Sequence, residues 1–334
     1  MHGFGDDNRV ANPVARQLFK PIPESKKSCL DDLVNVILPV CPSACFLQYV
    51  SSERCQPDLA ESDTNVGMVI EVNTEDKEPA TLLQLAENCD SVGQFLKEIP
   101  VYTAAQVSHI EELTRKQSAS PDWTKMRKGM ITASTVKRVV SKVEKLKIDQ
   151  TTESSALVKL LAGYSAPPPN MPALKYGREM ESHAKTCYTK VMRQFGHTSL
   201  TVRDSGLFVL AEHPYLGASP DGIVDCSCCG SGLLEVKCPL KAAGLIPDEC
   251  NVDCLELVDD KLLLKRNHSY FFQVQMQMGV TSKQWCDFFV YSSGGYVRER
   301  IFFNSGLWNE ILNAGVYFFQ NILAEELVHK KLKC

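Results

Sequence analysis

Three ionisable residues near the middle of the chain have types and spacing that could hold a divalent metal ion. Asp221 begins one short apolar run, and Glu235 and Lys237 lie in the next. If the second run is a strand, Glu235 and Lys237 point to the same face of a sheet. Two carboxylates and a lysine on one surface are costly to desolvate unless they share a partner. Mg²⁺ is such a partner, because it binds carboxylate oxygens together with substrate phosphates and water.

A lysine at that position could orient a metal-bound water and offset developing negative charge. The plainer interpretation is an exposed Glu–Lys pair on an edge strand, worth about 0–1 kcal/mol. Because the Glu-x-Lys triplet is common, that interpretation is the default for the triplet alone. The surrounding residues, Ser-Pro-Asp-Gly at 219–222 and Cys-Pro at 238–239, favour the metal site.

The elements that would carry these residues alternate between strands and helices. Strands are predicted at 221–225 and 232–238, joined by a hairpin rich in Cys, Gly and Ser, and again at 199–210, 283–291 and 297–303. Helical spacing is found at 82–99, 103–118, 173–194 and 305–331. Helices that flank a mixed central sheet indicate an α/β fold.

The order of an aspartate, a hairpin and Glu-x-Lys is similar to the PD-(D/E)XK nuclease core. Three further stretches resemble the YqaJ-like viral recombinase family of lambda exonuclease. They are WTKMRKGMITAS at 123–134, GREME at 177–181 and QVQMQM at 273–278. The resemblance covers about residues 121–281. It implies a restriction-endonuclease-like core and a metal-dependent 5′-to-3′ exonuclease that acts on double-stranded DNA ends in recombination or repair.

The resemblance also assigns roles to the acidic residues. It implies that Asp221, Glu235 and the backbone carbonyl of Val236 bind Mg²⁺ or Mn²⁺, and that Lys237 positions the attacking water. It implies that Glu181 completes the acidic cluster. On a helical wheel Glu181 lies at the edge of an apolar arc, where a carboxylate needs a partner. The alternative for Glu181 is a side chain that reaches solvent or an arginine.

The glutamine segment gives conflicting signals. Apolar residues alternate with Gln273, Gln275 and Gln277, and a period of two indicates a strand. The family resemblance implies a helix with a glutamine facing the metal site, and we follow it. In a helix Gln273 and Gln277 share a face, whereas Gln275 does not. Gln273 is our first candidate for the catalytic site, and Gln275 is the second, as a DNA contact.

Basic residues outnumber acidic ones in segment 121–149. Arg127 and Ser134 resemble the family's pocket for a terminal 5′-phosphate, where a guanidinium and a hydroxyl bind phosphate oxygens. The alternative is a solvated basic helix face. Trp123 either packs in the core or contacts the DNA end.

The chain has 14 cysteines. Three lie on the predicted hairpin at Cys226, Cys228 and Cys229, and Cys238 follows the second strand. This pattern lacks the paired Cys-x-x-Cys knuckles of common zinc sites. Unligated thiols are therefore the expected state, with Zn²⁺ at these four cysteines as the alternative.

The whole chain has 334 residues, a net charge of −4 and a pI of about 6.0, which neither indicates nor excludes nucleic-acid binding. We divide it into an N-terminal extension at 1–100 and a nuclease domain at 101–334. No apolar run is long enough for a membrane helix, and the N-terminus lacks signal-peptide character. These features predict a nuclear or cytoplasmic protein that is not secreted. The resemblance further implies a ring-shaped homotrimer around DNA.

Three other functions remain open at this point. The first is an endonuclease on the same core, the second is a non-catalytic DNA-binding protein with a nuclease fold, and the third is a zinc-structured interaction module around Cys226 to Cys238. Intact Asp221, Glu235 and Lys237 argue against the second, because a decayed site usually loses one of its residues.

Overall fold

A five-stranded mixed sheet carries the residues identified above. The computed structural model describes residues 80–165, 168 and 171–333, which lie in one compact unit, Thr74–Cys334. The sheet order is β10 (Gly295–Phe302), β9 (Trp285–Ser292), β6 (Gly230–Lys237), β5 (Gly222–Cys226) and β2 (Thr201–Arg203). β6 and β9 are parallel, and the other neighbours are antiparallel. β6 therefore occupies the centre of the sheet.

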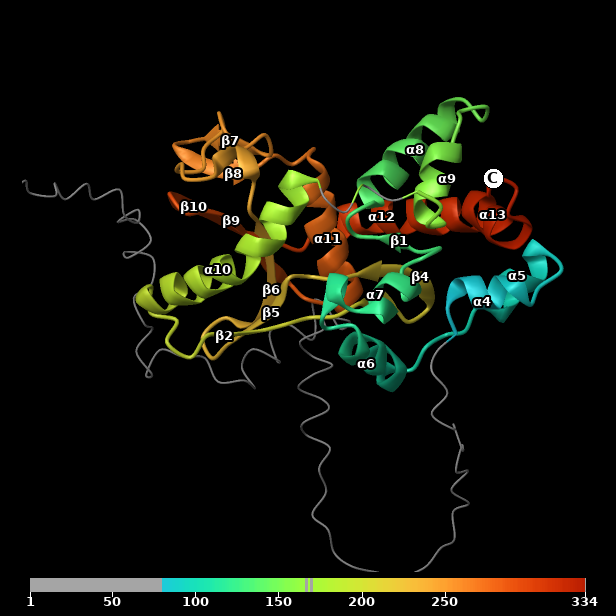
Figure 1. The fold of residues 1–334 in the computed structure, drawn as a ribbon, viewed down its shortest axis with the longest axis horizontal. Helices are drawn as coiled ribbons and strands as arrows, with labels where there is room; N and C mark the ends of the chain where they lie inside the picture. The colour runs from blue at the N-terminus through green and yellow to red at the C-terminus, as the bar shows by residue number, and fades with distance from the viewer. Residues whose placement is uncertain (1–79, 166–167, 169–170, 334) are drawn as a thin grey trace, which may run out of the picture. The chain divides into compact units, whose positions relative to one another are not determined.

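Two long helices cover opposite faces of this sheet (Figure 1). Side chains of α10 (Pro172–Gln194) pack with Leu234 and Val236 of β6. Side chains of α11 (Ser269–Thr281) pack with Leu233 of the same strand. Side chains alternate between the two faces of β6, so its even-numbered residues point toward α10 and its odd-numbered residues point toward α11. The predicted α/β class with helices around a mixed central sheet is confirmed.

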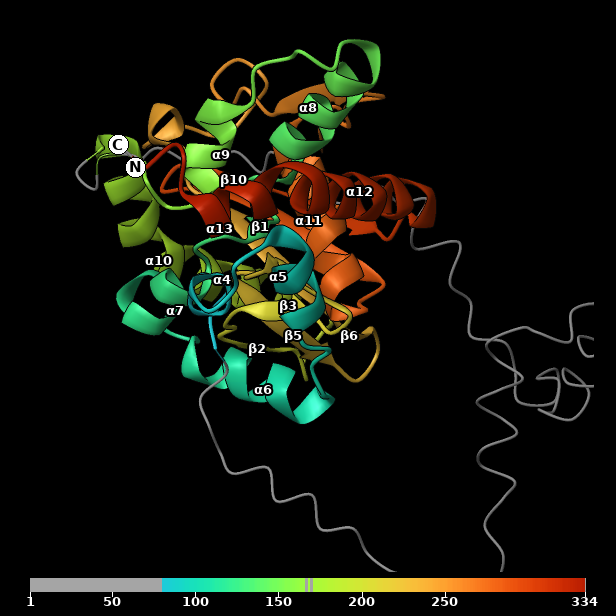
Figure 2. The ribbon, with the colours of Figure 1, turned by 90° about the vertical axis from the view of Figure 1, so that its right-hand side faces the viewer.

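A second core lies beside this sheet and is mainly helical. It joins a three-stranded sheet to the helices given below and to one side of α11, and its members pack in one hydrophobic cluster. The strands are β1 (Ile131–Thr132), β4 (His213–Ala218) and β3 (Phe208–Leu210). The helices are α4 (Leu82–Glu87), α5 (Val92–Glu98), α8 (Val136–Ile148), α9 (Ser155–Leu161), α12 (Ser305–Phe318) and α13 (Ala324–His329). In Figure 2, α8 and α9 lie on one side of α12 and α13, with α4 and α5 on the other.

The remaining described elements are short. They are α6 (Ala104–Leu113), η2 (Gln117–Ala119), α7 (Pro121–Met126), η3 (Leu240–Ala242), the hairpin of β7 (Leu255–Val258) and β8 (Lys261–Leu264), and a π-helical turn, η4 (Phe319–Leu323). Among the described residues no helix is both long and apolar enough to cross a membrane.

Two helices of the predicted extension at 1–100, α4 and α5, are part of the compact unit. Leu82, Ala86 and Phe95 of these helices are buried in the same core as α13. The packing therefore begins before residue 101, and residues 1–79 lie outside the described part of the chain. The helical segment predicted at 82–99 is two helices, because Thr81 and Ser91 each cap a separate N-terminus.

Candidate active site

The carboxylate of Glu235 is buried and held by three side chains. Its exposed fraction is 1%, and it lies on the face of β6 that meets α11. Oε1 accepts hydrogen bonds from Lys237 Nζ at 2.5 Å and Gln273 Nε2 at 2.6 Å. Oε2 accepts one from Gln277 Nε2 at 2.7 Å. Gln273 and Gln277 are one helical turn apart on α11, so both reach the same carboxylate.

Asp221 lies immediately before β5, next to the same strand. Its Oδ2 accepts a hydrogen bond from the backbone N–H of Val236 at 2.7 Å. Burial, together with the nearby charges of Glu235 and Glu181, raises the pKa of Asp221 well above its usual value. A half-buried carboxylate under this like-charge repulsion is a site that gains from a bound cation.

Lys237 is the cation already present in the cluster. Its Nζ also lies 4.2 Å from the centroid of the Tyr270 ring. Burial alone would lower the pKa of Lys237, but the charges of Glu235 and Asp221 raise it above its usual value. The side chain is therefore protonated at neutral pH. It can donate hydrogen bonds and offset negative charge, but it cannot act as a general base there.

Glu181 faces the same space from α10. It lines a cavity of about 620 Å³ together with Asp221, Lys237, Cys238 and Tyr270. Its Oε1 forms an ion pair with Lys185 Nζ at 2.8 Å. The structure therefore brings Glu181, Asp221, Glu235 and Lys237 together at one end of β6.

The donor set fits a hard divalent cation. Three carboxylates and the backbone carbonyl of Val236 are oxygen ligands, which Mg²⁺ and Mn²⁺ prefer. Each carboxylate has about four lone-pair sites, so the hydrogen bonds to Glu235 leave room for a metal. Burial and like-charge repulsion raise the pKa of Asp221, and a bound cation would offset that repulsion.

The glutamine segment is a helix, as the family resemblance implied. Gln273 contacts Glu235, whereas Gln275 does not enter the site. Gln275 is fully buried on another face of α11, where Nε2 donates to Phe302 O at 2.9 Å and Oε1 accepts from Asn304 N at 2.8 Å. The prediction of a DNA contact for Gln275 is replaced by this structural role. Gln277 was missed, although its spacing from Gln273 pointed to a shared face.

A second polar group contains the residues predicted to bind phosphate. The Arg127 guanidinium stacks 3.8 Å from the centroid of a Trp123 ring. Its Nη2 lies 3.4 Å from both Thr132 Oγ1 and Ser134 Oγ. Burial lowers the pKa of Arg127 to about 10. In the described part of the chain no carboxylate forms an ion pair with it, so this desolvated cation is suited to an anionic ligand.

The two polar groups are joined through the segment that leads into Asp221. Trp123 Nε1 donates to Ser219 Oγ at 2.9 Å. Gln117 Nε2 donates to the carbonyl of Pro220 at 2.8 Å and to that of Ser205 at 2.9 Å. Gln117 of η2 and Trp123 of α7 therefore fix the segment that leads into Asp221.

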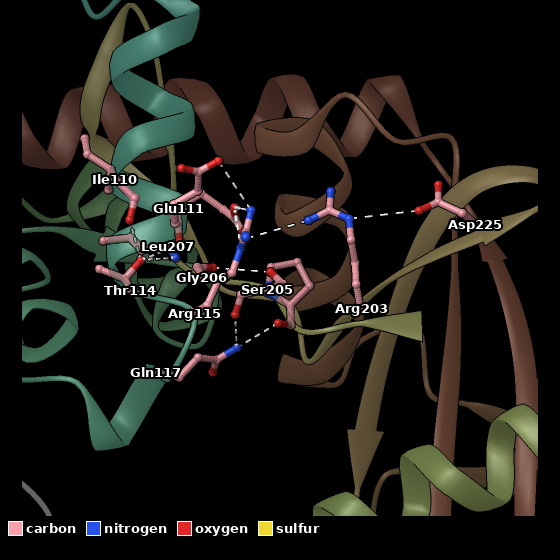
Figure 3. A network of polar contacts seen from close by, with 12 residues as sticks. Ile110, Glu111, Thr114, Arg115, Gln117, Arg203, Ser205, Gly206, Leu207 and Asp225 are labelled. Atoms are coloured by element: carbon pink, nitrogen blue, oxygen red, sulfur yellow. Dashed lines mark hydrogen bonds and ion pairs between the residues drawn. The ribbon is translucent and has the colours of Figure 1, made fainter. Parts of the chain in front are cut away.

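Figure 3 shows α6 side chains beside the neighbouring segment Ser205–Leu207, to which Gln117 also donates. The buried carboxylate of Glu111 accepts from the backbone N–H of Gly206 at 2.9 Å and pairs with Arg115. Thr114 Oγ1 accepts from Leu207 N–H at 2.7 Å. A Cβ on Gly206 would lie 1.9 Å from Glu111 O, so the close approach of α6 requires glycine at that position.

The structure separates one of the four cysteines considered as alternative zinc ligands from the other three. Cys238 follows β6 at the end near Asp221 and lines the cavity. Burial, and to a lesser extent Asp221, raises the pKa of the Cys238 thiol to about 12. Cys226, Cys228 and Cys229 lie at the other end of the hairpin, where His197 joins them. Cys229 comes just before β6 and Cys238 just after it, so the length of the strand separates Cys238 from the other three cysteines.

A central mixed sheet with an acidic cluster and a lysine at one end of its middle strand is a PD-(D/E)XK nuclease fold. Residues 122–284 match the model of the YqaJ-like viral recombinase domain. Over this segment, which is slightly less than half of its length, the chain is similar to the YqaJ-like viral recombinase family. A comparison with curated proteins found no match.

Solved structures similar to this chain include three exonucleases. The alkaline exonuclease of Laribacter hongkongensis has 26% sequence identity and a TM-score of 0.47, covering 64% of this chain and 97% of its own. The Shutoff and Exonuclease Protein of Kaposi's sarcoma associated herpesvirus has 14% identity and a TM-score of 0.43, covering 72% and 77%. A phage-related exonuclease from Haemophilus somnus has 16% identity and a TM-score of 0.39, covering 59% and 96%.

Proposed function

We propose that this chain is a divalent-metal-dependent exonuclease that degrades double-stranded DNA from its 5′ ends in recombination or repair. The convergence of Asp221 and Lys237 around the buried Glu235 within a YqaJ-like domain carries the proposal. The homotrimer and the nuclear or cytoplasmic location stay predictions.

Asp221, Glu235, Glu181 and the carbonyl of Val236 would hold Mg²⁺ or Mn²⁺. When bound, such an ion lowers the pKa of a water ligand and offsets charge on the phosphate oxygens. The chain's own residues supply the orientation. The two glutamines on α11 prevent the Glu235 carboxylate from rotating, and Val236 N–H fixes Asp221.

Lys237 would hold the nucleophilic water in line with the scissile bond through its ammonium group. As the water oxygen attacks phosphorus, the 3′ oxygen leaves, and the 5′-phosphate stays on the shortened strand. The ammonium also lies where negative charge develops on the phosphate. Arg127 and Ser134 would bind the terminal 5′-phosphate and thereby set the polarity of digestion.

The experiment that tests this function is digestion of a linear duplex that carries a 5′-phosphate and a label at either end. With Mg²⁺ we expect stepwise loss from the 5′ end, and with a chelator we expect none. A covalently closed circle should remain intact. Cleavage of the circle would indicate an endonuclease, and DNA binding without cleavage under any metal would indicate a non-catalytic protein.

Replacing Arg127 by alanine should weaken discrimination between 5′-phosphate and 5′-hydroxyl ends by roughly 10–100-fold. The estimate follows from the loss of a charge-assisted hydrogen bond, worth about 1.5–3 kcal/mol. The measurement is the ratio of kcat/KM for the two ends. Lys125→Ala, which removes an exposed cation from α7, is the matched control and should keep the wild-type ratio. An unchanged ratio in Arg127→Ala would remove this residue from end recognition.

A further inference from the structure

Four potential metal ligands meet at the tip of the β5–β6 hairpin, away from the acidic cluster. They are His197, Cys226, Cys228 and Cys229, and one ligand atom from each lies within 4.8 Å of the others. The distances from His197 Nδ1 to the sulfur atoms of Cys226, Cys228 and Cys229 are 3.8, 3.1 and 3.4 Å. Cys228 Sγ lies 3.2 Å from Cys226 Sγ and 3.7 Å from Cys229 Sγ.

These separations are close to those of a tetrahedral zinc site. Zn–S bonds of about 2.3 Å and Zn–N bonds of about 2.0–2.1 Å place neighbouring ligand atoms about 3.5–3.8 Å apart. We propose that His197 Nδ1 and the thiolates of Cys226, Cys228 and Cys229 bind one structural Zn²⁺ ion. Four protein ligands close the coordination sphere, which is typical of structural rather than catalytic zinc.

The hairpin geometry explains how one short segment can supply three ligands. Cys226 ends β5 and pairs with Gly230, which begins β6 with φ of +72°. The chain therefore reverses within residues 227–229, and Cys226 and Cys229 have Cys-x-x-Cys spacing. The backbone N–H groups of Cys228 and Cys229 hydrogen-bond to Cys226 Sγ, an arrangement that favours a thiolate.

Neighbouring residues hold both halves of the cluster in place. Ser199 Oγ lies 2.6 Å from Ser227 Oγ and accepts from Ser227 N–H at 3.0 Å, which ties the hairpin to the segment after His197. Trp285 Nε1 donates to Cys229 O at 3.2 Å. The Arg300 guanidinium contacts the Cys229 side chain. Because three thiolates and Zn²⁺ carry a net negative charge, Arg300 complements the proposed site.

The position of the cluster indicates what the ion would stabilise. At about 3.3 Å per residue, Cys226 lies roughly 16 Å along β5 from Asp221. Zinc would link the turn after α10 to the hairpin whose opposite end carries Asp221 and Lys237. α10 also supplies Glu181. The ion would therefore connect the elements that position the acidic cluster, although the ion itself would not contact that cluster.

The test is metal analysis of the purified full-length chain, kept reduced and dialysed against metal-free buffer. We expect about one zinc per chain in the wild type. Cys228→Ser removes an exposed ligand and should lose most of the zinc, whereas Cys250→Ser removes an exposed cysteine outside the cluster and should keep it. Asp221→Asn should also retain the zinc, because the catalytic cluster is a separate site.

Cobalt substitution provides a readout that does not depend on a variant's folding. Co²⁺ bound to the wild-type chain should show thiolate-to-cobalt charge-transfer absorption and the visible bands of a tetrahedral site. Three results would overturn the proposal. They are a wild-type chain with neither zinc nor the cobalt spectrum, a folded Cys228→Ser chain with unchanged zinc, and a disulfide within 226–229 in the reduced preparation.

Discussion

Replacing Lys237 by alanine is expected to lower the single-turnover rate of DNA cleavage by about 10²–10³-fold, the usual loss for a group that stabilises transition-state charge. Lys237 is held against Glu235, and the charges of Glu235 and Asp221 keep it protonated. The alanine variant removes the ammonium group but leaves both carboxylates. DNA affinity should therefore change little, since the loss falls on the chemical step.

Single-turnover rates at saturating enzyme, with DNA affinity measured separately, distinguish these two effects. Lys261→Ala serves as the control, because Lys261 is an exposed lysine of β8 that does not line the cavity. It should keep the wild-type cleavage rate. Thermal unfolding of both variants checks that the site remains folded. Wild-type cleavage by a folded Lys237→Ala chain would exclude Lys237 from the mechanism.

Asp221→Asn should abolish metal-dependent cleavage and at the same time raise the Tm of the metal-free protein. Burial and the neighbouring carboxylates raise the pKa of Asp221 in the folded state above its unfolded value. The folded state therefore binds the proton more tightly, and its free energy of unfolding falls as pH rises through that pKa. Asparagine removes the charge and keeps an acceptor for Val236 N–H.

The measurement is Tm between pH 5 and pH 8 in the presence of a chelator. The wild type should gain stability as pH falls, whereas the gain due to Asp221 should be missing in Asp221→Asn. Each 1 kcal/mol corresponds to roughly 2–4 °C in a domain of this size. Asp225→Asn, at an exposed position of the same strand, is the control and should show no rise. A lower Tm for Asp221→Asn at pH 8 would contradict the like-charge explanation.

Local pattern was sufficient to place the two strands that carry the catalytic cluster. The spacing of Glu235 and Lys237 predicted a shared face, and the structure has both on the α11 side of β6. The same pattern could not show which residues of other elements meet Glu235. Gln273 and Gln277 are separated from it by a β-hairpin and a loop, and their contact depends on how α11 packs.

The period of two in segment 272–278 has a physical explanation. Phe272 and Met276 face the mainly helical core, while Val274 and Met278 face the core of the five-stranded sheet. A helix between two cores is apolar on more than one side, so its sequence loses the single stripe of an amphipathic helix. The family resemblance corrected the strand signal, but it could not assign Gln275 to the β10–α12 junction.

The ligands of the proposed zinc site show the same limit of sequence reasoning. Cys226, Cys228 and Cys229 were visible as a cluster, but His197 comes from the turn after α10 and reaches them through tertiary structure. Cys238 is near them along the chain and distant in the fold. Strand direction, rather than sequence separation, decides which cysteines meet.

The central place of β6 has a consequence for how the site moves. A strand hydrogen-bonded on both edges exposes its amides to hydrogen exchange mainly through global unfolding, so Glu235 and Lys237 are attached to slowly exchanging backbone. Glu181 is fixed differently, by a partly exposed ion pair with Lys185, an interaction worth about 0–1 kcal/mol. The site therefore combines Glu235 and Lys237, whose backbone keeps its register for the lifetime of the native state, with Glu181, whose side chain can reorient on the timescale of side-chain motion.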